Sequence, residues 1–208
     1  GTVVCQSVLL PRGNPLELLR LGYELQLPAN MGNVTYYGRG PEENYADRKS
    51  GMPLGVYKTT ARDSFFPYGR PQDCGNHEDT RWVAVTDDKG QGLLFGSVGA
   101  PFAFSAIPYT TTDLILANHP VELPKTTDKT VLVLSSATRG LGGASCGPGP
   151  MSRDIIKANK PYPLSFFMRP VTSKSYKGEI RVPAAQLDMT MLTRTDKYTV
   201  KSVTSQEQ

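Results

Sequence analysis

The sequence lacks the marks of a membrane protein, a metalloprotein or a nucleic-acid-binding protein. No apolar run approaches the roughly 20 residues that a membrane-spanning helix needs. The 3 cysteines form no CxxC pair and the 2 histidines lie far apart, so no zinc or thioredoxin motif is present. The net charge of +4 is mild, without the basic cluster that nucleic acid requires. We therefore expect a soluble protein that binds neither membranes nor nucleic acid, in a cytoplasmic or periplasmic compartment that the sequence leaves open.

Helical patterns are also scarce. The best one covers residues 110–118, where Thr110 or Asp113 can cap a short helix. The 20 glycines and 17 prolines are too many for a helical bundle, and the hydrophobic share of 38% is too high for a disordered chain. At 208 residues, roughly 70% of the unfolded surface can be buried, so a substantial core is expected.

Short strands separated by turn signals dominate what is present. Residues 21–27 alternate apolar and polar side chains, as half-buried strands do. Residues 87–90 end in Gly90 and predict a hairpin turn between two apolar runs. The pattern predicts an all-β fold, an antiparallel sandwich. The expected strands cover 21–27, 34–37, 82–86, 92–96, 102–106, 130–134 and 164–169.

Three long connections, at 38–53, 67–80 and 138–150, are rich in Gly, Pro, Asn, Asp and Arg. Long irregular loops in a compact domain usually carry function or form interfaces. Beyond Pro170 the composition shifts to Ser, Thr and Lys, which predicts a domain over 1–170 and a C-terminal extension of extra strands or a tether over 171–208. The chain opens on strand-like residues rather than a signal peptide, so we expect a piece of a longer protein.

No self-contained active site emerges from the residues alone. Glycoside hydrolysis needs two carboxyl groups about 5–5.5 Å apart in retaining enzymes or about 6.5–9.5 Å in inverting ones. Glu43 and Asp47 lie beside Arg39 and Arg48, which favours a carboxylate–guanidinium network that holds loops. No phosphate-binding loop or GxSxG nucleophile motif is present. The other acidic candidates are Glu42, Glu78 and Asp79, with Asp87 and Asp88 in the hairpin turn.

Residues 37–48, which read YGRGPEENYADR, resemble the YGRGPxENYxDR signature in the C-terminal β-sandwich of the large β-galactosidases of glycoside hydrolase family 2. Further motifs of that domain follow in order, so the resemblance covers about residues 8–170. They are YGRPQDCGN at 68–76 followed by Arg81-Trp82, FAFSA at 102–106, HPVELP at 119–124 and GLGGASCGP at 140–148.

The resemblance implies a galactose-mutarotase-like supersandwich that packs beside a catalytic (β/α)₈ barrel of the same parent chain. The family's catalytic glutamates lie on that barrel, so this chain is expected to contain no catalytic residue and to be inactive by itself. The parent would hydrolyse β-galactosides by the retaining route. The resemblance also implies no cofactor or metal in this chain, while the parent's Mg²⁺ and Na⁺ belong to barrel sites.

The resemblance assigns a substrate-pocket loop to residues 139–149, namely Arg139, Gly142, Gly143, Ser145 and Cys146. The family's GGDDSWGP loop places a tryptophan against the sugar. Here the loop is one residue shorter, Ala144 replaces both acidic positions, and Cys146 stands at the tryptophan position. Because cysteine offers little of an aromatic ring's apolar face, direct sugar stacking is not expected at this position.

The signature segment itself is expected to be a structural clamp, or an interface with the barrel, formed by Arg39, Glu43, Asn44, Asp47 and Arg48. Two other functions stay open. An aldose 1-epimerase would need a general acid and a general base, supplied by His77 or His119 with Glu78 or Glu122. A carbohydrate-binding module would need exposed aromatic residues, for which the candidates are Tyr36, Tyr45, Phe65, Phe66 and Tyr68.

Overall fold

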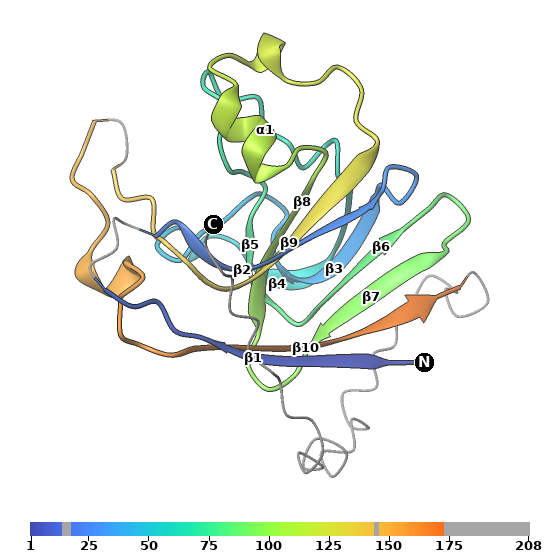
Figure 1. Ribbon diagram of the computed structural model, residues 1–208, viewed down its shortest axis with the longest axis horizontal. Coiled ribbons are helices and arrows are strands. Elements are labelled where there is room, and N and C mark those ends of the chain that lie inside the picture. Colours follow the sequence, from blue (N-terminus) through green and yellow to red (C-terminus); the bar gives the residue numbers. More distant parts are fainter. Residues whose placement is uncertain (14–17, 144–145, 173–208) are drawn as a thin grey trace, which may run out of the picture. The chain divides into compact units, whose positions relative to one another are not determined.

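The computed structural model describes residues 1–13, 18–143 and 146–172. In this part of the chain, ten β-strands form two antiparallel sheets, with one short α-helix (Figure 1). The strands are β1 (Val3–Leu9), β2 (Arg20–Pro28), β3 (Asn33–Arg39), β4 (Leu54–Thr60), β5 (His77–Thr80), β6 (Trp82–Thr86), β7 (Gly92–Ser97), β8 (Phe102–Ile107), β9 (Lys129–Thr138) and β10 (Tyr162–Val171). The helices are α1 (Thr111–Leu116) and the 3₁₀ turns η1 (Pro120–Glu122) and η2 (Ser152–Asp154).

The six-stranded sheet has the order β1-β10-β7-β6-β3-β4, and the four-stranded sheet has the order β2-β9-β8-β5. β1 and β10 lie side by side in Figure 1 although they come from the two ends of the described chain, with Val4 opposite Phe167. The expected antiparallel all-β sandwich is therefore confirmed. Among the described residues, none of the helices has the length and apolar character needed to cross a membrane.

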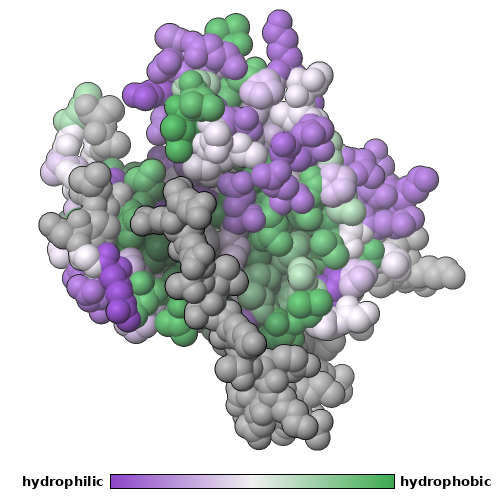
Figure 2. All heavy atoms as spheres, in the orientation of Figure 1, coloured by the Kyte–Doolittle hydropathy of each residue, from purple (hydrophilic) through white to green (hydrophobic). Residues whose placement is uncertain are grey.

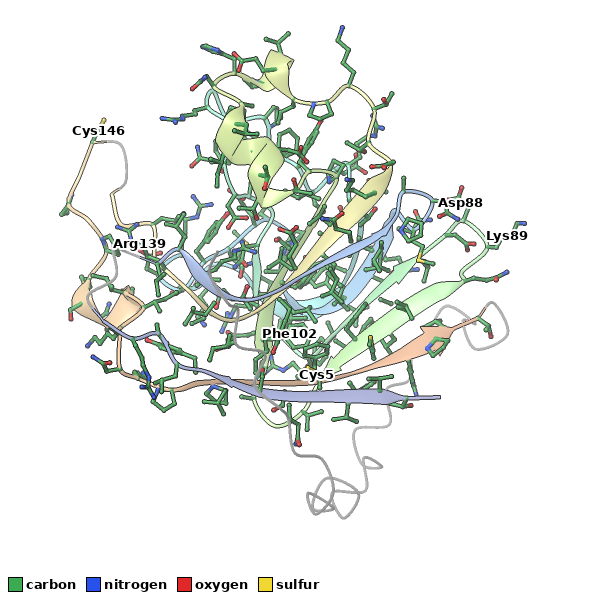
Figure 3. The ribbon with its side chains drawn as sticks, viewed as in Figure 1. Cys5, Asp88, Lys89, Phe102, Arg139 and Cys146 are labelled. Carbon is green, nitrogen blue, oxygen red and sulfur yellow. The ribbon has the colours of Figure 1, made fainter. Side chains whose placement is uncertain are left out.

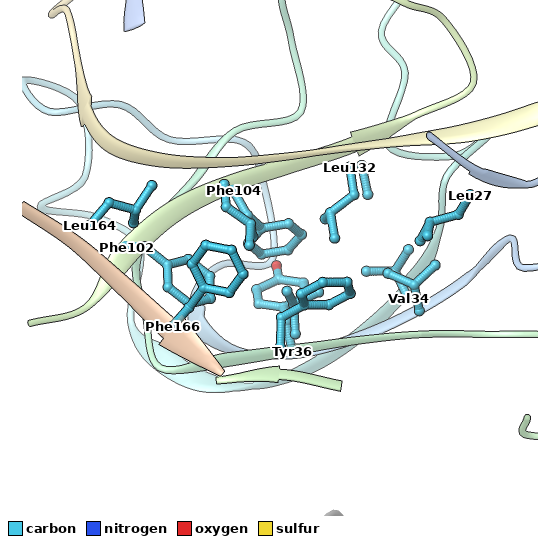
Figure 4. Packing of buried hydrophobic residues seen from close by; sticks show 13 residues of the cluster. Leu27, Val34, Tyr36, Phe102, Phe104, Leu132, Leu164 and Phe166 are labelled. Carbon is cyan, nitrogen blue, oxygen red and sulfur yellow. The ribbon is translucent and has the colours of Figure 1, made fainter. Parts of the chain in front are cut away.

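The main core fills the space between the two sheets. Alternate residues of β3 and β6, such as Tyr36 and Val83, face Phe104 of β8 and Leu132 of β9 (Figure 4). Each of these side chains is at most 1% exposed, and burying a large apolar side chain contributes roughly 1.5–3 kcal/mol. A second cluster under α1 contains Cys74, Ile107, Leu114, Ala117 and Leu123.

Most of the expected elements are present. β6 and β7 form the predicted hairpin, in which Asp87 Oδ1 accepts from the N–H groups of Lys89 and Gln91 and Gly90 has a φ of +72°. Thr110 caps α1, and its side chain and that of Asp113 satisfy each other's backbone N–H groups.

The loop expected over 67–80 is partly wrong, because its last four residues form β5. The HEDT sequence of β5 carries no strand pattern. His77 and Thr80 pair with Phe104 and Phe102 of β8, and the ladder is irregular between them, where Asp79 has a φ of +52°. β4, which the sequence analysis did not predict, pairs with β3 along its whole length. Both strands are therefore specified by their partners. The expected extension over 171–208 lies outside the described residues from residue 173 onward.

Figure 2 shows apolar side chains in the middle of one face of the molecule, with hydrophilic side chains around them at the top and upper right. Large apolar residues are exposed on β1 and on the two sides of the connection that follows it. They are Val3, Val4, Val8, Leu10 and Leu19, with exposed fractions between 40% and 65%.

Candidate functional site

Asn44 is the centre of the signature segment, and it is completely buried. Its Nδ2 donates to the carbonyl oxygens of Arg39 at 3.1 Å and Glu42 at 3.0 Å, and its Oδ1 accepts from the Glu78 N–H at 2.8 Å. Asn76 completes the contact, since its carbonyl accepts from the Asn44 N–H at 2.7 Å and its Nδ2 donates to the Asn44 carbonyl at 2.8 Å. These bonds join the connection after β3 to the start of β5.

Glu43 gathers a second set of partners. Its carboxylate accepts from the hydroxyls of Tyr45, at 3.2 Å, and Tyr68, and from the Gly75 N–H at 2.9 Å, and it pairs with Arg48 at 3.1 Å. Burial and the neighbouring Glu43 raise the pKa of Tyr68 to about 12, so its hydroxyl remains a donor at physiological pH. The carboxylate of Glu43 is therefore occupied by groups of its own chain.

Arg39 holds a third set of contacts. Its Nε pairs with Asp79, and its Nη1 donates to the carbonyl oxygens of Lys49 at 3.2 Å and Met52 at 2.9 Å. Lys49 Nζ also pairs with Asp79 at 3.1 Å. Burial would raise the pKa of Asp79, but its bonds to Arg39 and Lys49 hold it below the usual value. The structure thus brings Arg39, Glu43, Asn44 and Arg48 into one network, which the partners Asp79 and Lys49 extend.

Asp47 connects the signature segment to the 139–149 loop. Its Oδ1 accepts from the Leu141 N–H at 2.9 Å, and its Oδ2 accepts from the Gly142 N–H at 2.7 Å. The pKa of Asp47 would be raised by its partial burial, yet these two backbone donors and the charge of Arg48 hold it below the usual value. The expected clamp and the expected pocket loop are therefore in direct contact.

The 139–149 loop is anchored at its start and extends to an exposed tip. The Arg139 N–H donates to the Leu19 carbonyl at 2.8 Å, and Cys146 near the tip is exposed. Figure 3 shows Arg139 and Cys146 on the same side of the molecule, with Cys146 farther out. Gly143 accepts from the Cys146 N–H at 3.1 Å, and Ser145 lies outside the described residues.

A small cavity of about 120 Å³ lies at the base of this loop, between Arg20, Tyr45, Asp73, Arg139 and Leu141. Arg20 pairs with Asp73 on its wall. Ligand pockets usually enclose about 300–1,000 Å³, so this cavity suits a few water molecules rather than a sugar ring. If the loop lines a galactoside pocket, other parts of the protein must supply most of its walls.

A larger groove of about 540 Å³ lies on another side of the clamp. Phe66, which is 57% exposed, lies in it with its ring centroid 4.5 Å from that of Tyr68. Charged groups line the same groove, including Arg48 and Lys58. Of the other aromatic candidates, Tyr36 and Tyr45 are buried, and Phe65 packs against the cluster under α1.

The two histidines lie in different surroundings. His77 is buried, stacked on Phe104 and hydrogen-bonded through Nδ1 with the Tyr36 hydroxyl at 3.0 Å. Its burial lowers its pKa to about 4. His119 is 71% exposed and contacts Glu122 at 2.9 Å on the surface turn η1. The structure therefore does not bring the two histidines together.

No group of three or more His, Cys, Asp or Glu side chains that could hold a metal ion occurs in the described ranges. Cys5, Cys74 and Cys146 are free thiols. Sequence reasoning did not assign Tyr68, Asn76 or Asp79 to the network, although two of them lie in the second motif of the resemblance. Their contacts join residues 25–40 positions apart, which no local pattern reveals.

The fold and the site together define a β-sandwich domain whose long loops are joined by a buried amide and by carboxylates already bound to their own chain. Within that class, the chain belongs to the beta-galactosidase small-chain family, which matches residues 1–168.

The chain is also similar to proteins named as beta-galactosidases, one of which is named as a small subunit. The chain is 43% identical over 147 residues to the beta-galactosidase BgaC of Bifidobacterium adolescentis, covering 69% of this chain and 14% of that protein. It is 33% identical over 173 residues to a beta-galactosidase of Priestia megaterium, covering 82% and 16%. It is 40% identical over 132 residues to the beta-galactosidase small subunit of Latilactobacillus sakei, covering 59% and 41%. The chain thus spans less than half the length of each of these relatives.

Proposed function

We propose that this chain is the non-catalytic C-terminal sandwich of a retaining family 2 β-galactosidase, with a galactose-mutarotase-like fold. It packs on the (β/α)₈ barrel that carries the catalytic glutamates and lends its 139–149 loop to the galactoside pocket. The observation that carries the proposal is the family match over residues 1–168, in a chain that spans only 14–16% of two full-length relatives.

The condition of the acidic residues supports a non-catalytic role. A retaining glycosidase needs one carboxyl group with a raised pKa as acid and a second one free to attack the sugar. In the network, Glu43 and Asp79 are bound to their own chain, and the pKa of Asp79 is lowered. The carboxylate of Asp47 is likewise engaged, and its pKa is also lowered. These groups stabilise loops and are poorly placed to act on a substrate.

Two surface features support association with a larger partner. The exposed apolar residues of β1 and the following connection would gain stability if covered, because burial of apolar surface yields about 25 cal/mol per Å². The cavity at the base of the 139–149 loop is too small for a sugar and would need further walls. We also propose that the Mg²⁺ and Na⁺ of the parent enzyme bind at sites on the barrel.

Complementation tests the proposal. The purified chain is assayed with nitrophenyl β-galactoside alone and after co-expression with the barrel-containing remainder of the enzyme. Activity is expected only in the combined sample, with the two parts co-eluting in size-exclusion chromatography. Turnover by the chain alone, well above a no-protein control, would refute the non-catalytic role, and activity of the remainder without the chain would refute the pocket role.

A second candidate function is carbohydrate binding by the chain itself, which the exposed ring of Phe66 in the 540 Å³ groove favours. An aromatic face can pack against the C–H side of a pyranose while charged groups bind its hydroxyls. Calorimetric titration with galactose and lactose tests it. Saturation at millimolar or lower concentration that is lost in Phe66→Ala supports this function, and an absence of heat excludes it.

The epimerase alternative has less support, because His77 is buried and the exposed His119–Glu122 pair lies on a surface turn. Polarimetry with fresh α-galactose tests it. An acceleration that His119→Ala abolishes would favour an epimerase over the proposed role.

A further inference from the structure

The contact between Asp47 and the 139–149 loop joins two segments that lie 94 and 95 residues apart in the sequence. Each carboxylate oxygen accepts from a different backbone N–H, that of Leu141 at 2.9 Å and that of Gly142 at 2.7 Å. A carboxylate bound at both oxygens fixes the direction as well as the distance of the loop, as bidentate contacts do.

The packing around this contact leaves little freedom. A Cβ atom at residue 140 would lie 2.7 Å from Asp47 Oδ2 and 2.9 Å from the Cβ of Asp154, so glycine is required there for the close approach. The Gly140 N–H donates to the Asp154 carbonyl at 2.8 Å. Three successive amides of the loop base, at residues 140, 141 and 142, are therefore held by two aspartates from separate connections.

The other backbone hydrogen bonds of the described part of the loop lie within it or at its start. Gly143 donates to the Pro148 carbonyl at 2.8 Å, which closes the loop on itself, and the Arg139 N–H donates to Leu19. Among the described contacts, Asp47 provides the side-chain link from the signature segment to this loop. Without its carboxylate, the loop would keep its internal bonds but lose the link that sets its angle to the sandwich.

We propose that Asp47 is a positioning residue for the galactoside pocket: its carboxylate sets the position of the 139–149 loop without touching the substrate. This inference rests on the proposed function, in which that loop lines the pocket. The ionised form is the one required, since only a carboxylate presents two acceptors and no donor to the two N–H groups. The signature segment then acts in substrate recognition through the loop that it holds.

The test is Asp47→Asn in the intact β-galactosidase. Asparagine offers one acceptor oxygen and turns an NH₂ group toward the second N–H, so one bond is lost and two donors face each other. When only a fraction of the molecules hold the loop in the correct position, the apparent dissociation constant equals the intrinsic constant divided by that fraction. We expect KM for nitrophenyl β-galactoside to rise roughly two- to thirtyfold, with kcat within about twofold of wild type. A loss of folded enzyme would instead lower the apparent kcat and leave KM unchanged.

Asp87→Asn is the matched control. The Asp87 carboxylate also accepts two backbone N–H bonds, from Lys89 and Gln91, in the hairpin turn at the opposite side of the molecule, where Figure 3 labels Asp88 and Lys89. We expect this variant to keep the wild-type KM. If both variants raise KM equally, or if Asp47→Asn leaves KM unchanged, the positioning role is overturned.

Hydrogen exchange measured by mass spectrometry gives a second readout that needs no substrate. In the intact enzyme, a peptide containing Leu141 and Gly142 is expected to exchange at least about tenfold faster in Asp47→Asn, whereas peptides from β6 and β7 are unchanged. Equal exchange in wild type and variant would overturn the inference. If the Asp47→Asn peptide exchanges faster but the wild-type enzyme does not hydrolyse the galactoside, the failure lies in the proposed function, and the Asp47 contact stands.

Discussion

Replacing Asn44 by alanine tests whether the signature segment stabilises the sandwich. The substitution removes three side-chain hydrogen bonds and leaves the carbonyls of Arg39 and Glu42 and the N–H of Glu78 without those partners. Each buried polar group left unpaired costs about 1–3 kcal/mol. Because the Arg39 carbonyl keeps its hydrogen bond with His77 Nδ1 and Glu42 is exposed to water, the Glu78 N–H carries most of the cost, and we expect a loss of roughly 2–4 kcal/mol. That is a large part of the about 5–15 kcal/mol that stabilises a typical domain.

Urea unfolding of the purified chain measures this loss. Trp82 is the single tryptophan and is 6% exposed, so its fluorescence reports the unfolding of the six-stranded sheet. Asn33→Ala is the matched control, because the Asn33 side chain makes one surface hydrogen bond, to Asp88 at 2.9 Å, and is expected to cost less than about 1 kcal/mol. Equal free energies of unfolding for the two variants would refute the reasoning that the buried amide holds the loops.

Three further predictions follow from single residues. Burial lowers the pKa of His77 to about 4, so between pH 6.5 and 4 the unfolded chain binds a proton that the folded chain excludes. The free energy of unfolding therefore has its full value above pH 6.5 and falls by about 3 kcal/mol as the pH drops through that window. Urea titrations at pH 7 and 4.5 should show a smaller drop in His77→Gln than in wild type. Gly142→Ala should raise KM in the intact enzyme by roughly fivefold or more. The φ of Gly142 is +62°, and the new Cβ would lie 2.6 Å from backbone atoms of Gly149 and Pro150. Gly149→Ala is the control and should have the wild-type KM, because no atom lies within 4 Å of its Cβ. Cys146→Trp should lower the inhibition constant for galactose roughly two- to tenfold, because it adds an aromatic face at the exposed end of the loop. If the inhibition constant of Cys146→Trp equals those of wild type and Cys146→Ser, residue 146 does not lie in the pocket.

The local elements of the fold could be predicted because their signals are local. The β6–β7 hairpin follows from two apolar runs around a turn whose Asp87 and Gly90 act within five residues. The α1 cap depends on Thr110 and Asp113, three residues apart. β5 gave no such signal, because its four polar residues become a strand only by pairing with β8.

The sequence predicted which residues belong to the candidate site, but not which hydrogen bonds and ion pairs those residues form. Sequence proximity correctly placed Glu43 beside Arg48, and their ion pair spans five residues. The partner of Arg39 is Asp79, which lies 40 residues away. The backbone of Asp79 has a positive φ, which no pattern in the sequence predicts. Asp47 was grouped with the clamp, and only the fold shows that its carboxylate faces the 139–149 loop.

The sequence by itself determined the all-β class, the turns, the family motifs and the set of residues from which the loops are built. The tertiary structure alone decided which of those residues meet: Asn44 with Glu78, Arg39 with Asp79, and Asp47 with the amides of Leu141 and Gly142. The physical reason is range. Periodicity and turn chemistry depend on residues a few positions apart. A carboxylate, in contrast, accepts hydrogen bonds from any N–H group that the packing of the two sheets brings within about 3 Å of its oxygens, however distant that group is in the sequence.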